Sequence, residues 1–177
     1  MSGARRSRRA WGWHPLVDEW AAKVVADANV RPGQYVLDIG AGTGALTRHL
    51  VAAGARVLAI EPHPGRADVL QERFAGQPVT VLRIDARELV LPRRPFRVVA
   101  NPPYSITSDL VRKLLKTPSG MVAADLVLQR AAARRFSDPA RVPPRWRTEI
   151  GRTVPRKAFR PPPQVDSAVL VIRRRFR

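Results

Sequence analysis

VLDIGAGTGALTRHL, at residues 36–50, is the first of four segments that decide the fold; VLAIEPH (57–63), VLRIDA (81–86) and VVANPPY (98–104) follow it. Each segment begins with a run of β-branched or aliphatic residues and ends in a polar or glycine-rich turn. Helical patterns separate the first run from the second and the second from the third. This alternation is typical of a parallel sheet whose ligand-binding loops lie at the carboxyl ends of its strands.

Apolar runs continue this pattern toward the C-terminus. Strands are predicted at residues 35–39, 56–60, 79–84, 97–100, 121–128, 150–157 and 167–175. The last two fit an antiparallel pair. Residues 137–147 alternate proline and arginine without periodicity, which predicts an exposed loop. The predicted fold class is therefore α/β, with a mostly parallel seven-stranded sheet, helices on both faces and an antiparallel last strand.

The composition is that of one globular domain. The chain has 177 residues, of which 45% are hydrophobic, and no stretch approaches the roughly 20 apolar residues of a membrane helix. No apolar segment follows the basic N-terminus, so a signal peptide is not expected. Cysteine is absent and the three histidines lack metal-ligand spacing, so no metal is expected. We predict a flexible basic arm at residues 1–10, a single domain at residues 11–177, and a cytoplasmic location.

Net charge is the strongest bulk signal. The formal charge is +18, from 32 Lys and Arg residues against 14 Asp and Glu residues. Such a charge favours a polyanionic partner and indicates nucleic acid. Arginine suits bidentate phosphate contacts and stacking on bases. The alternatives are a basic surface kept for solubility and an arginine-rich composition that follows from a GC-rich genome.

The turn DIGAGTG (38–44) joins a predicted strand to a predicted helix. Its glycines allow special backbone dihedrals and a close approach of ligand to backbone. The spacing differs from the dinucleotide and triphosphate motifs, so a cofactor without phosphates fits better. S-adenosyl-L-methionine is the common case. We expect Asp38, Gly40, Gly42 and Gly44 to bind it, and the alternative is a purely structural turn.

Two acidic residues follow the next strands. Glu61 lies about 20 positions after the first glycine, which is the ribose-binding position of nucleoside-binding α/β folds. Asp85, followed by Ala86, ends the third run, where an acceptor can bind the adenine amino group of a cofactor. The alternatives are a solvated carboxylate at the end of a strand for Glu61 and a turn cap for Asp85.

Residues NPPY (101–104) follow the fourth predicted strand. An exocyclic amine is a poor nucleophile because its lone pair is delocalised into the ring. The Asn101 side-chain oxygen and the Pro102 carbonyl can accept its two hydrogens, and the prolines stiffen that backbone. Positioning and electrostatics then carry most of the rate, while Tyr104 can stack on the planar target. The alternative is a proline-rich turn without catalytic function.

With these motifs in place, residues 11–175 resemble the ribosomal RNA adenine-N6 methyltransferases, which include the erythromycin-resistance enzymes and the small-subunit adenine dimethyltransferases. The segment FRPPPQVDS (159–167) adds a motif specific to that family. The resemblance implies the Rossmann-like fold of S-adenosylmethionine-dependent methyltransferases. It also implies that Phe159 stacks on a flipped target base, and that His14 and Leu16 contact the cofactor. WGWH (11–14) stands where the family usually has a Gln-Asn/His-Phe element.

The sequence is most similar to the macrolide-resistance branch, in particular to its short actinobacterial members. This implies N6-methylation of an adenine in 23S ribosomal RNA and macrolide–lincosamide–streptogramin resistance, in a short type without the C-terminal helical domain of typical members. We also expect a monomer. RNA binding would then fall to arginines of the catalytic domain. The expected RNA contacts are Arg5, Arg6, Arg8, Arg9, Arg93, Arg94, Arg134, Arg135, Arg145, Arg147, Arg173, Arg174 and Arg175.

Alternative functions stay open on sequence alone. The motif NPPY serves any planar amine or amide, so a DNA adenine or a protein glutamine methyltransferase is an alternative enzyme. A small-subunit rRNA adenine dimethyltransferase lies within the same resemblance. A non-catalytic RNA-binding or ribosome-assembly factor is the alternative of a different class.

Overall fold

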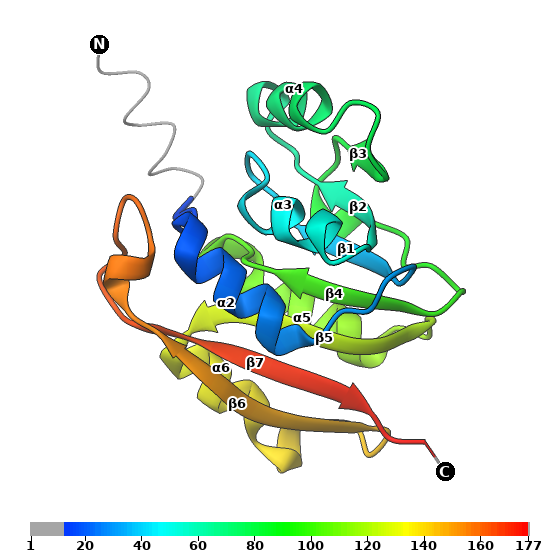
Figure 1. The fold of residues 1–177 in the computed structure, drawn as a ribbon. Helices are drawn as coiled ribbons and strands as arrows, with labels where there is room; N and C mark the ends of the chain where they lie inside the picture. The colour runs from blue at the N-terminus through cyan, green and yellow to red at the C-terminus, as the bar shows by residue number, and fades with distance from the viewer. Residues whose placement is uncertain (1–12, 177) are drawn as a thin grey trace.

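The structure is a computed structural model that describes residues 13–176. The predicted basic arm, with Arg5, Arg6, Arg8 and Arg9, lies outside the described residues. Seven strands form one sheet in the order β3-β2-β1-β4-β5-β7-β6 (Figure 1). The strands are β1 (Tyr35–Ile39), β2 (Arg56–Ile60), β3 (Val79–Leu82), β4 (Phe96–Ala100), β5 (Met121–Gln129), β6 (Trp146–Val154) and β7 (Ser167–Arg174).

Strands β1 to β5 are parallel, and β7 is antiparallel to both β5 and β6. The described helices are α2 (Asp18–Ala28), α3 (Ala45–Ala52), α4 (Pro64–Arg73), α5 (Thr107–Lys116) and α6 (Arg130–Ser137). Short 3-10 turns add η1 (Ala86–Glu88), η2 (Tyr104–Ile106), η3 (Pro139–Arg141) and η4 (Arg156–Ala158). The predicted fold class is confirmed.

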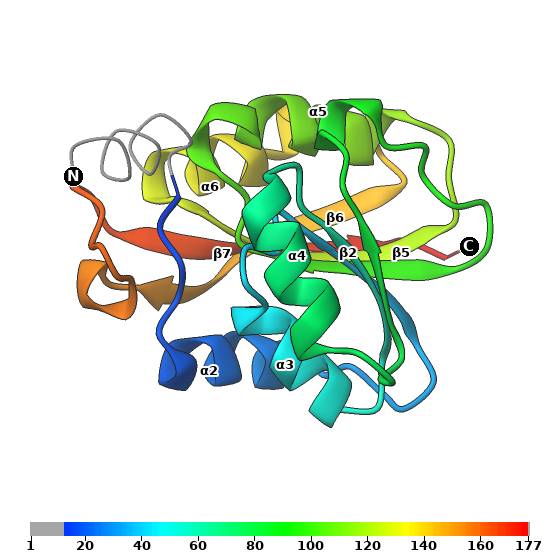
Figure 2. The same ribbon diagram turned by 90° about the horizontal axis from the view of Figure 1, so that it is seen from above.

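The sheet separates two apolar layers. Seen from above, α5 and α6 lie on one side of it, whereas α2 and α3 lie on the other (Figure 2). Side chains alternate along β1: Leu37 and Ile39 pack with α5 and α6, while Val36 packs with α2 and α3. This period of two is what a strand buried on both faces requires. Asp38 is the buried polar residue on the α3 side of β1.

One predicted loop is wrong in part. The sequence predicts exposure throughout residues 137–147, but β6 begins at Trp146, whose side chain is only 3% exposed. Its indole Nε1 donates to the Leu115 carbonyl (3.0 Å) at the end of α5. Burial of a large aromatic ring outweighs the loop character of the surrounding prolines.

None of the helices within residues 13–176 is long and apolar enough to cross a membrane. In the same part of the chain, no group of three or more His, Cys, Asp and Glu side chains is arranged to hold a metal ion.

Candidate active site

The glycine-rich turn after β1 and the NPPY turn after β4 lie in contact. The amides of Gly40 and Ala41 donate to the Ile60 carbonyl (2.8 and 3.0 Å), which holds the turn against the end of β2. Gly40 has φ +76°, and a Cβ there would lie 2.9 Å from Cδ of Pro103. Only glycine allows both this dihedral and this close approach. Because the two turns are in contact, the two predicted motifs form one site at the carboxyl edge of the sheet.

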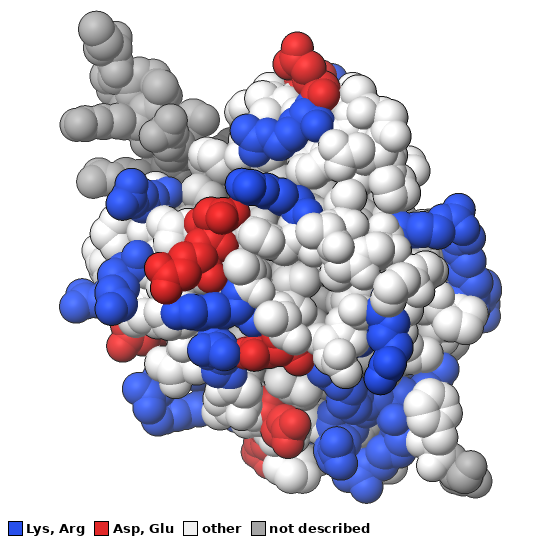
Figure 3. Space-filling model, in the orientation of Figure 1, with Lys and Arg blue, Asp and Glu red and all other residues white. Residues whose placement is uncertain are grey.

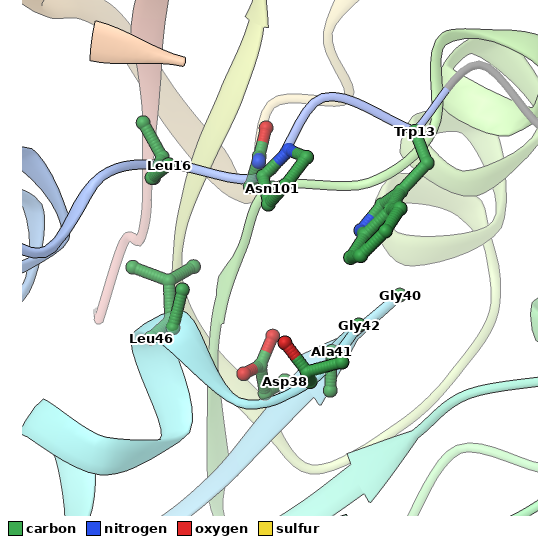
Figure 4. A pocket seen from close by; sticks show the side chains of 11 residues that line it. Trp13, Leu16, Asp38, Gly40, Ala41, Gly42, Leu46 and Asn101 are labelled. Carbon is green, nitrogen blue, oxygen red and sulfur yellow. The ribbon is translucent and has the colours of Figure 1, made fainter. Parts of the chain in front are cut away.

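A cavity opens between these turns and the segment that precedes α2. Figure 4 shows Asp38 and the glycine turn on one side, Asn101 opposite them, and Trp13 and Leu16 closing the ends. A Cβ on Gly42 would lie 2.8 Å from Nε1 of Trp13, so the indole covers the turn. The remaining volume is about 20 Å³.

Asp38 is the unusual group of this cavity. Its side chain is 1% exposed, and Oδ2 accepts from the Thr47 hydroxyl at 2.7 Å. Among the described residues, Oδ1 is buried without a hydrogen-bond partner. Burial raises the pKa of Asp38 to about 7, with Thr47 opposing the shift and Glu61 adding to it. A buried acceptor of this kind fits a positively charged ligand.

Glu61 holds the glycine turn from the end of β2. Its Oε1 accepts from the amide of Gly42 and its Oε2 from the amide of His63, both at 2.9 Å. Nε of Arg66 lies 3.7 Å from Oε2. The solvated alternative for Glu61 is wrong, because the residue is 3% exposed. Each carboxylate oxygen of Glu61 keeps a further lone pair, which can accept a hydrogen bond from a ribose hydroxyl. Ribose binding by Glu61 is thus a proposal.

A second cavity, of about 290 Å³, lies beside the first and shares Gly40 with it. Its lining includes Ile60, Asp85, Ala86, Pro103 and Ile106. The Asp85 carboxylate caps η1 through the Arg87 amide at 2.8 Å. It also binds the Arg87 guanidinium (both contacts 3.1 Å), which lowers the pKa of Asp85. The structure thus shows the capping role, and a role toward adenine remains a proposal.

The Asn101 carboxamide has a defined orientation. Its Nδ2 lies 3.0 Å from the His14 carbonyl oxygen. A carbonyl only accepts hydrogen bonds, so the amide nitrogen must face it and Oδ1 must point away. His14 itself donates from Nδ1 to the Pro161 carbonyl at 2.8 Å, and its ring stacks on Tyr104 with centroids 5.5 Å apart. Burial raises the pKa of Tyr104, whose hydroxyl lies 3.4 Å from Oγ of Ser167.

The structure does not place Phe159 on an open surface. The side chain is 1% exposed and belongs to the core on the α2 face. It forms a β-bridge with Leu16, and flanking bonds join Val17 to the Ala158 carbonyl (2.8 Å) and Arg160 to the Pro15 carbonyl (3.0 Å). The expected stacking on a target base is therefore not available in this conformation, because the side chain is buried in the core.

The expected RNA-binding arginines do not form one surface. Arg134 and Arg135 lie near the site, in two adjoining grooves of about 530 and 340 Å³; Tyr104 and Gln129 line the second of these. Arg130 and Arg156, which are not among the expected contacts, line the first. The other expected arginines lie at the edge of the sheet opposite the site: in the loop before β4, at the start of β6 and at the end of β7. They are Arg93, Arg94, Arg145, Arg147, Arg174 and Arg175.

Arg173 has a structural partner, and its expected contact with RNA stays a prediction. Its guanidinium is bound to the buried carboxylate of Asp125, at 2.9 and 3.0 Å. Arg97, which is 8% exposed, binds the same carboxylate at 3.3 Å. A buried carboxylate needs such partners, and sequence alone does not show that Asp125 faces inward.

Two residues of the site are not evident from the sequence motifs. Trp13 covers the glycine turn, and Thr47 partners Asp38. Thr47 could have been found, because it lies on the face of the predicted helix that turns toward the sheet. For Trp13, the only signal is its place beside His14.

Comparison with known proteins decides the family. Residues 5–177 match the family described as ribosomal RNA adenine dimethylase. The chain belongs to this family. The cofactor of this family is S-adenosyl-L-methionine.

The relatives include both branches of rRNA adenine methyltransferases. Ribosomal RNA small subunit methyltransferase A of Synechococcus sp. (strain JA-3-3Ab) is 36% identical, over 92% of this chain and 66% of the relative. An rRNA methyltransferase of Streptomyces thermotolerans is also 36% identical, over 98% of this chain and 61% of the relative. The crystal structure of the 23S rRNA methyltransferase ErmE matches with TM-score 0.80 and 35% identity, over 90% of this chain and 69% of that chain. The chain thus spans less than two thirds of the length of either curated relative.

The residues present fit this cofactor in charge and shape. The unpartnered oxygen of Asp38 suits the ammonium of its methionine end, the glycine turn allows close contact, and the second cavity suits its adenine. The first cavity, of about 20 Å³, holds about one water molecule, and Trp13 is the side chain that covers the glycine turn there.

Proposed function

We propose that this protein is an S-adenosylmethionine-dependent methyltransferase that modifies N6 of an adenine in 23S ribosomal RNA, in the cytoplasm, and thereby confers macrolide–lincosamide–streptogramin resistance. The observation that carries the proposal is the orientation of Asn101. Its amide nitrogen is held by the His14 carbonyl, which leaves the oxygen to accept a hydrogen from an incoming amine. The turn that bears Asn101 touches the cofactor turn at Gly40.

The chemistry follows from this arrangement. The cofactor supplies a methyl group on a positively charged sulfur. Oδ1 of Asn101 and the carbonyl of Pro102 accept the two hydrogens of the adenine amine, which directs the nitrogen lone pair toward that methyl group. Pro102 is buried and lies against the glycine turn at Gly40, so both acceptors are positioned before the reaction. No strong base is needed, because the proton is lost after the nitrogen has become cationic.

Recognition of the base is assigned to Tyr104. One neighbour of its ring is the His14 imidazole, and the residue also lines the groove that contains Gln129 and Arg135. A flipped adenine entering along this groove would stack on Tyr104 and reach Asn101 next to it. Phe159 would join the stack only after its buried side chain becomes exposed.

RNA is the substrate that the surroundings of the site favour. Arg130, Arg134 and Arg156 line the groove next to Tyr104, together with Gln129 and Gln164. Guanidinium groups bind phosphates and amide groups bind base edges. We propose that residues 11–177 form one catalytic domain that acts as a monomer and binds the unpaired loop around the target through this groove.

Similarity to the 23S rRNA methyltransferase ErmE favours 23S rRNA. A second candidate is dimethylation of small-subunit rRNA, because the Synechococcus small-subunit enzyme, at 36% identity, is about as similar to this chain as ErmE is, at 35%. The two candidates share the chemistry of the site and differ only in the RNA that is presented to it.

A methyl-transfer assay on separate substrates tests the proposal. Purified protein and labelled cofactor are incubated with protein-free 23S rRNA, 16S rRNA, duplex DNA and a release factor. We expect label in 23S rRNA, and mass spectrometry of the digested RNA should show N6-methyladenine. Label confined to 16S rRNA would establish the second candidate, and label confined to DNA or protein would overturn the proposal. Expression in a macrolide-sensitive host then tests resistance.

A further inference from the structure

Five arginines gather at the edge of the sheet opposite the active site: Arg94, Arg145, Arg147, Arg174 and Arg175. We call them the distal arginine surface. In Figure 3, Lys and Arg side chains crowd the lower right of the molecule, where Figure 1 places the C-terminal end of β7. The distance between this surface and the active site can be estimated along β7. Ser167 lies beside Tyr104, and Arg174 is seven residues further along the strand, about 24 Å at 3.4 Å per residue.

Several of these side chains are held in place by aromatic rings and carbonyls. The Arg94 guanidinium lies 3.9 Å from the Tyr35 ring centroid, and that of Arg174 lies 5.4 Å from the Trp146 centroid. Arg145 donates to the Leu115 carbonyl at 2.7 Å. Such contacts order the guanidinium groups and reduce the entropy that is lost when a ligand binds.

No ion pair joins any of the five to a carboxylate within residues 13–176. Elsewhere in the fold, arginines that serve stability are paired, as Arg97 and Arg173 are with Asp125. Unpaired like charges at one edge repel each other, which makes this edge a site of positive potential. Phe176, which is 78% exposed, adds an aromatic ring beside Arg175. Exposed cations next to an exposed aromatic ring favour nucleic acid over an acidic protein.

We propose that the distal arginine surface is a second docking site for the phosphate backbone of the RNA substrate. It binds RNA about 24 Å from the base that is methylated, a distance estimated from strand geometry. The inference takes its substrate class from the proposed function. A short loop that fills the active site cannot reach this surface, whereas a loop carried on a folded stem can. The protein therefore distinguishes RNAs by their extent as well as by the target loop.

The test uses two RNA hairpins with the same target loop, one with a stem too short to span about 24 Å and one with a longer stem. Binding is measured for wild type, for R94Q/R174Q, and for R48Q/R112Q, which removes the same charge at exposed positions in α3 and α5. Wild type and the control should bind the long hairpin more tightly than the short one. In R94Q/R174Q we expect that preference to fall about tenfold and the slope of log K against log salt to fall by about 1.5.

An unchanged preference for the long hairpin in R94Q/R174Q would overturn the proposal. Methyl transfer to the short hairpin separates this outcome from failure of the proposed function. The distal variant should methylate that RNA at the wild-type rate. If wild type methylates neither hairpin, the proposed function fails, and the binding comparison still decides whether the surface docks RNA. Thermal unfolding of both variants shows that each is folded.

Discussion

At Asn101, the side-chain nitrogen donates to the His14 carbonyl, and the oxygen is left as an acceptor. Replacement by alanine removes this acceptor and leaves the grooves around the site unchanged. We expect N101A to lose methyl transfer by about 10²- to 10³-fold, as for other preorganised polar groups at reacting atoms, with RNA affinity within about twofold of wild type. Single-turnover methylation and filter binding measure the two effects. A variant that methylates at the wild-type rate would contradict the role assigned to Asn101.

The raised pKa of Asp38 predicts that the stability of the folded protein depends on pH. Burial raises its pKa to about 7, against about 3.9 in the unfolded chain. The folded state therefore holds the proton more tightly, and this contribution to stability is lost as pH rises from about 4 through 7. In D38N the contribution is absent. Between pH 4 and 8, the free energy of unfolding of wild type should therefore fall by about 2–4 kcal/mol more than that of D38N. Urea titration without cofactor measures both proteins. Parallel pH profiles would show that Asp38 is not buried as a neutral acid.

The same raised pKa predicts that the affinity for the cofactor depends on pH. An ammonium beside Oδ1 favours the carboxylate, so binding releases a proton below pH 7. The affinity of wild type for S-adenosylmethionine should rise with pH up to about 7, by at most about tenfold per unit, and should level off above it. D38N should bind more weakly and without this rise. Calorimetry at several pH values measures both. Equal pH profiles for the two proteins would place the ammonium away from Asp38.

Residues of the site differ in how far their sequence reveals them. Asp38, Gly40 and Asn101 could be predicted because each ends a strand, and strand ends meet at one edge of a parallel sheet. The burial of Phe159 could not, since it depends on pairing between residues 16 and 159, which are far apart in the chain. The role of Trp13 depends on the same pairing.

Among the elements, β4, β5 and β7 are joined by a buried charge network. Asp125 is 2% exposed and binds both Arg97 and Arg173, and Arg97 also donates to the Ala28 and Asn29 carbonyls after α2. D125A leaves Arg97 buried without a counter-charge. We expect a loss of about 3 kcal/mol in the free energy of unfolding, measured in urea.

The matched control for D125A is D27A, which breaks the exposed pair between Asp27 in α2 and Arg152 in β6. Exposed pairs contribute little, so D27A should cost less than about 1 kcal/mol. Equal losses in the two variants would mean that burial of the Asp125 network is not what matters.

The limits of prediction at the scale of elements lie in β6. The order of the strands along the chain could be predicted throughout, because hydrophobic periodicity is a local signal. The apolar pattern places the start of β6 at residue 150, whereas the strand begins at Trp146. Trp146 stands among prolines and arginines, and only its tertiary partner Leu115 shows that it is buried.

At the scale of the whole molecule, the net charge of +18 predicts a polyanion partner but not where it binds. The net charge is a sum over the sequence, whereas the position of a basic surface depends on which strand ends lie together in the fold. Arg134 and Arg145 are close in sequence, yet one lies near the active site and the other at the far edge of the sheet. The antiparallel direction of β7 moves the C-terminal arginines away from Asn101.

The basic arm provides the last prediction. Arg5, Arg6, Arg8 and Arg9 precede the described residues and, like the distal arginine surface, are expected to bind phosphates rather than bases. Replacing all four by glutamine should weaken binding of the long and short hairpins by the same factor. The salt slope should fall by up to about 3, near 0.7 per phosphate contact on single strands. We expect the arm and the distal arginine surface to bind different phosphates, so their effects on the salt slope should add in a combined variant with R94Q/R174Q. An unchanged slope in the arm variant would place the arm away from the RNA. A combined effect smaller than the sum would mean that both bind the same phosphates.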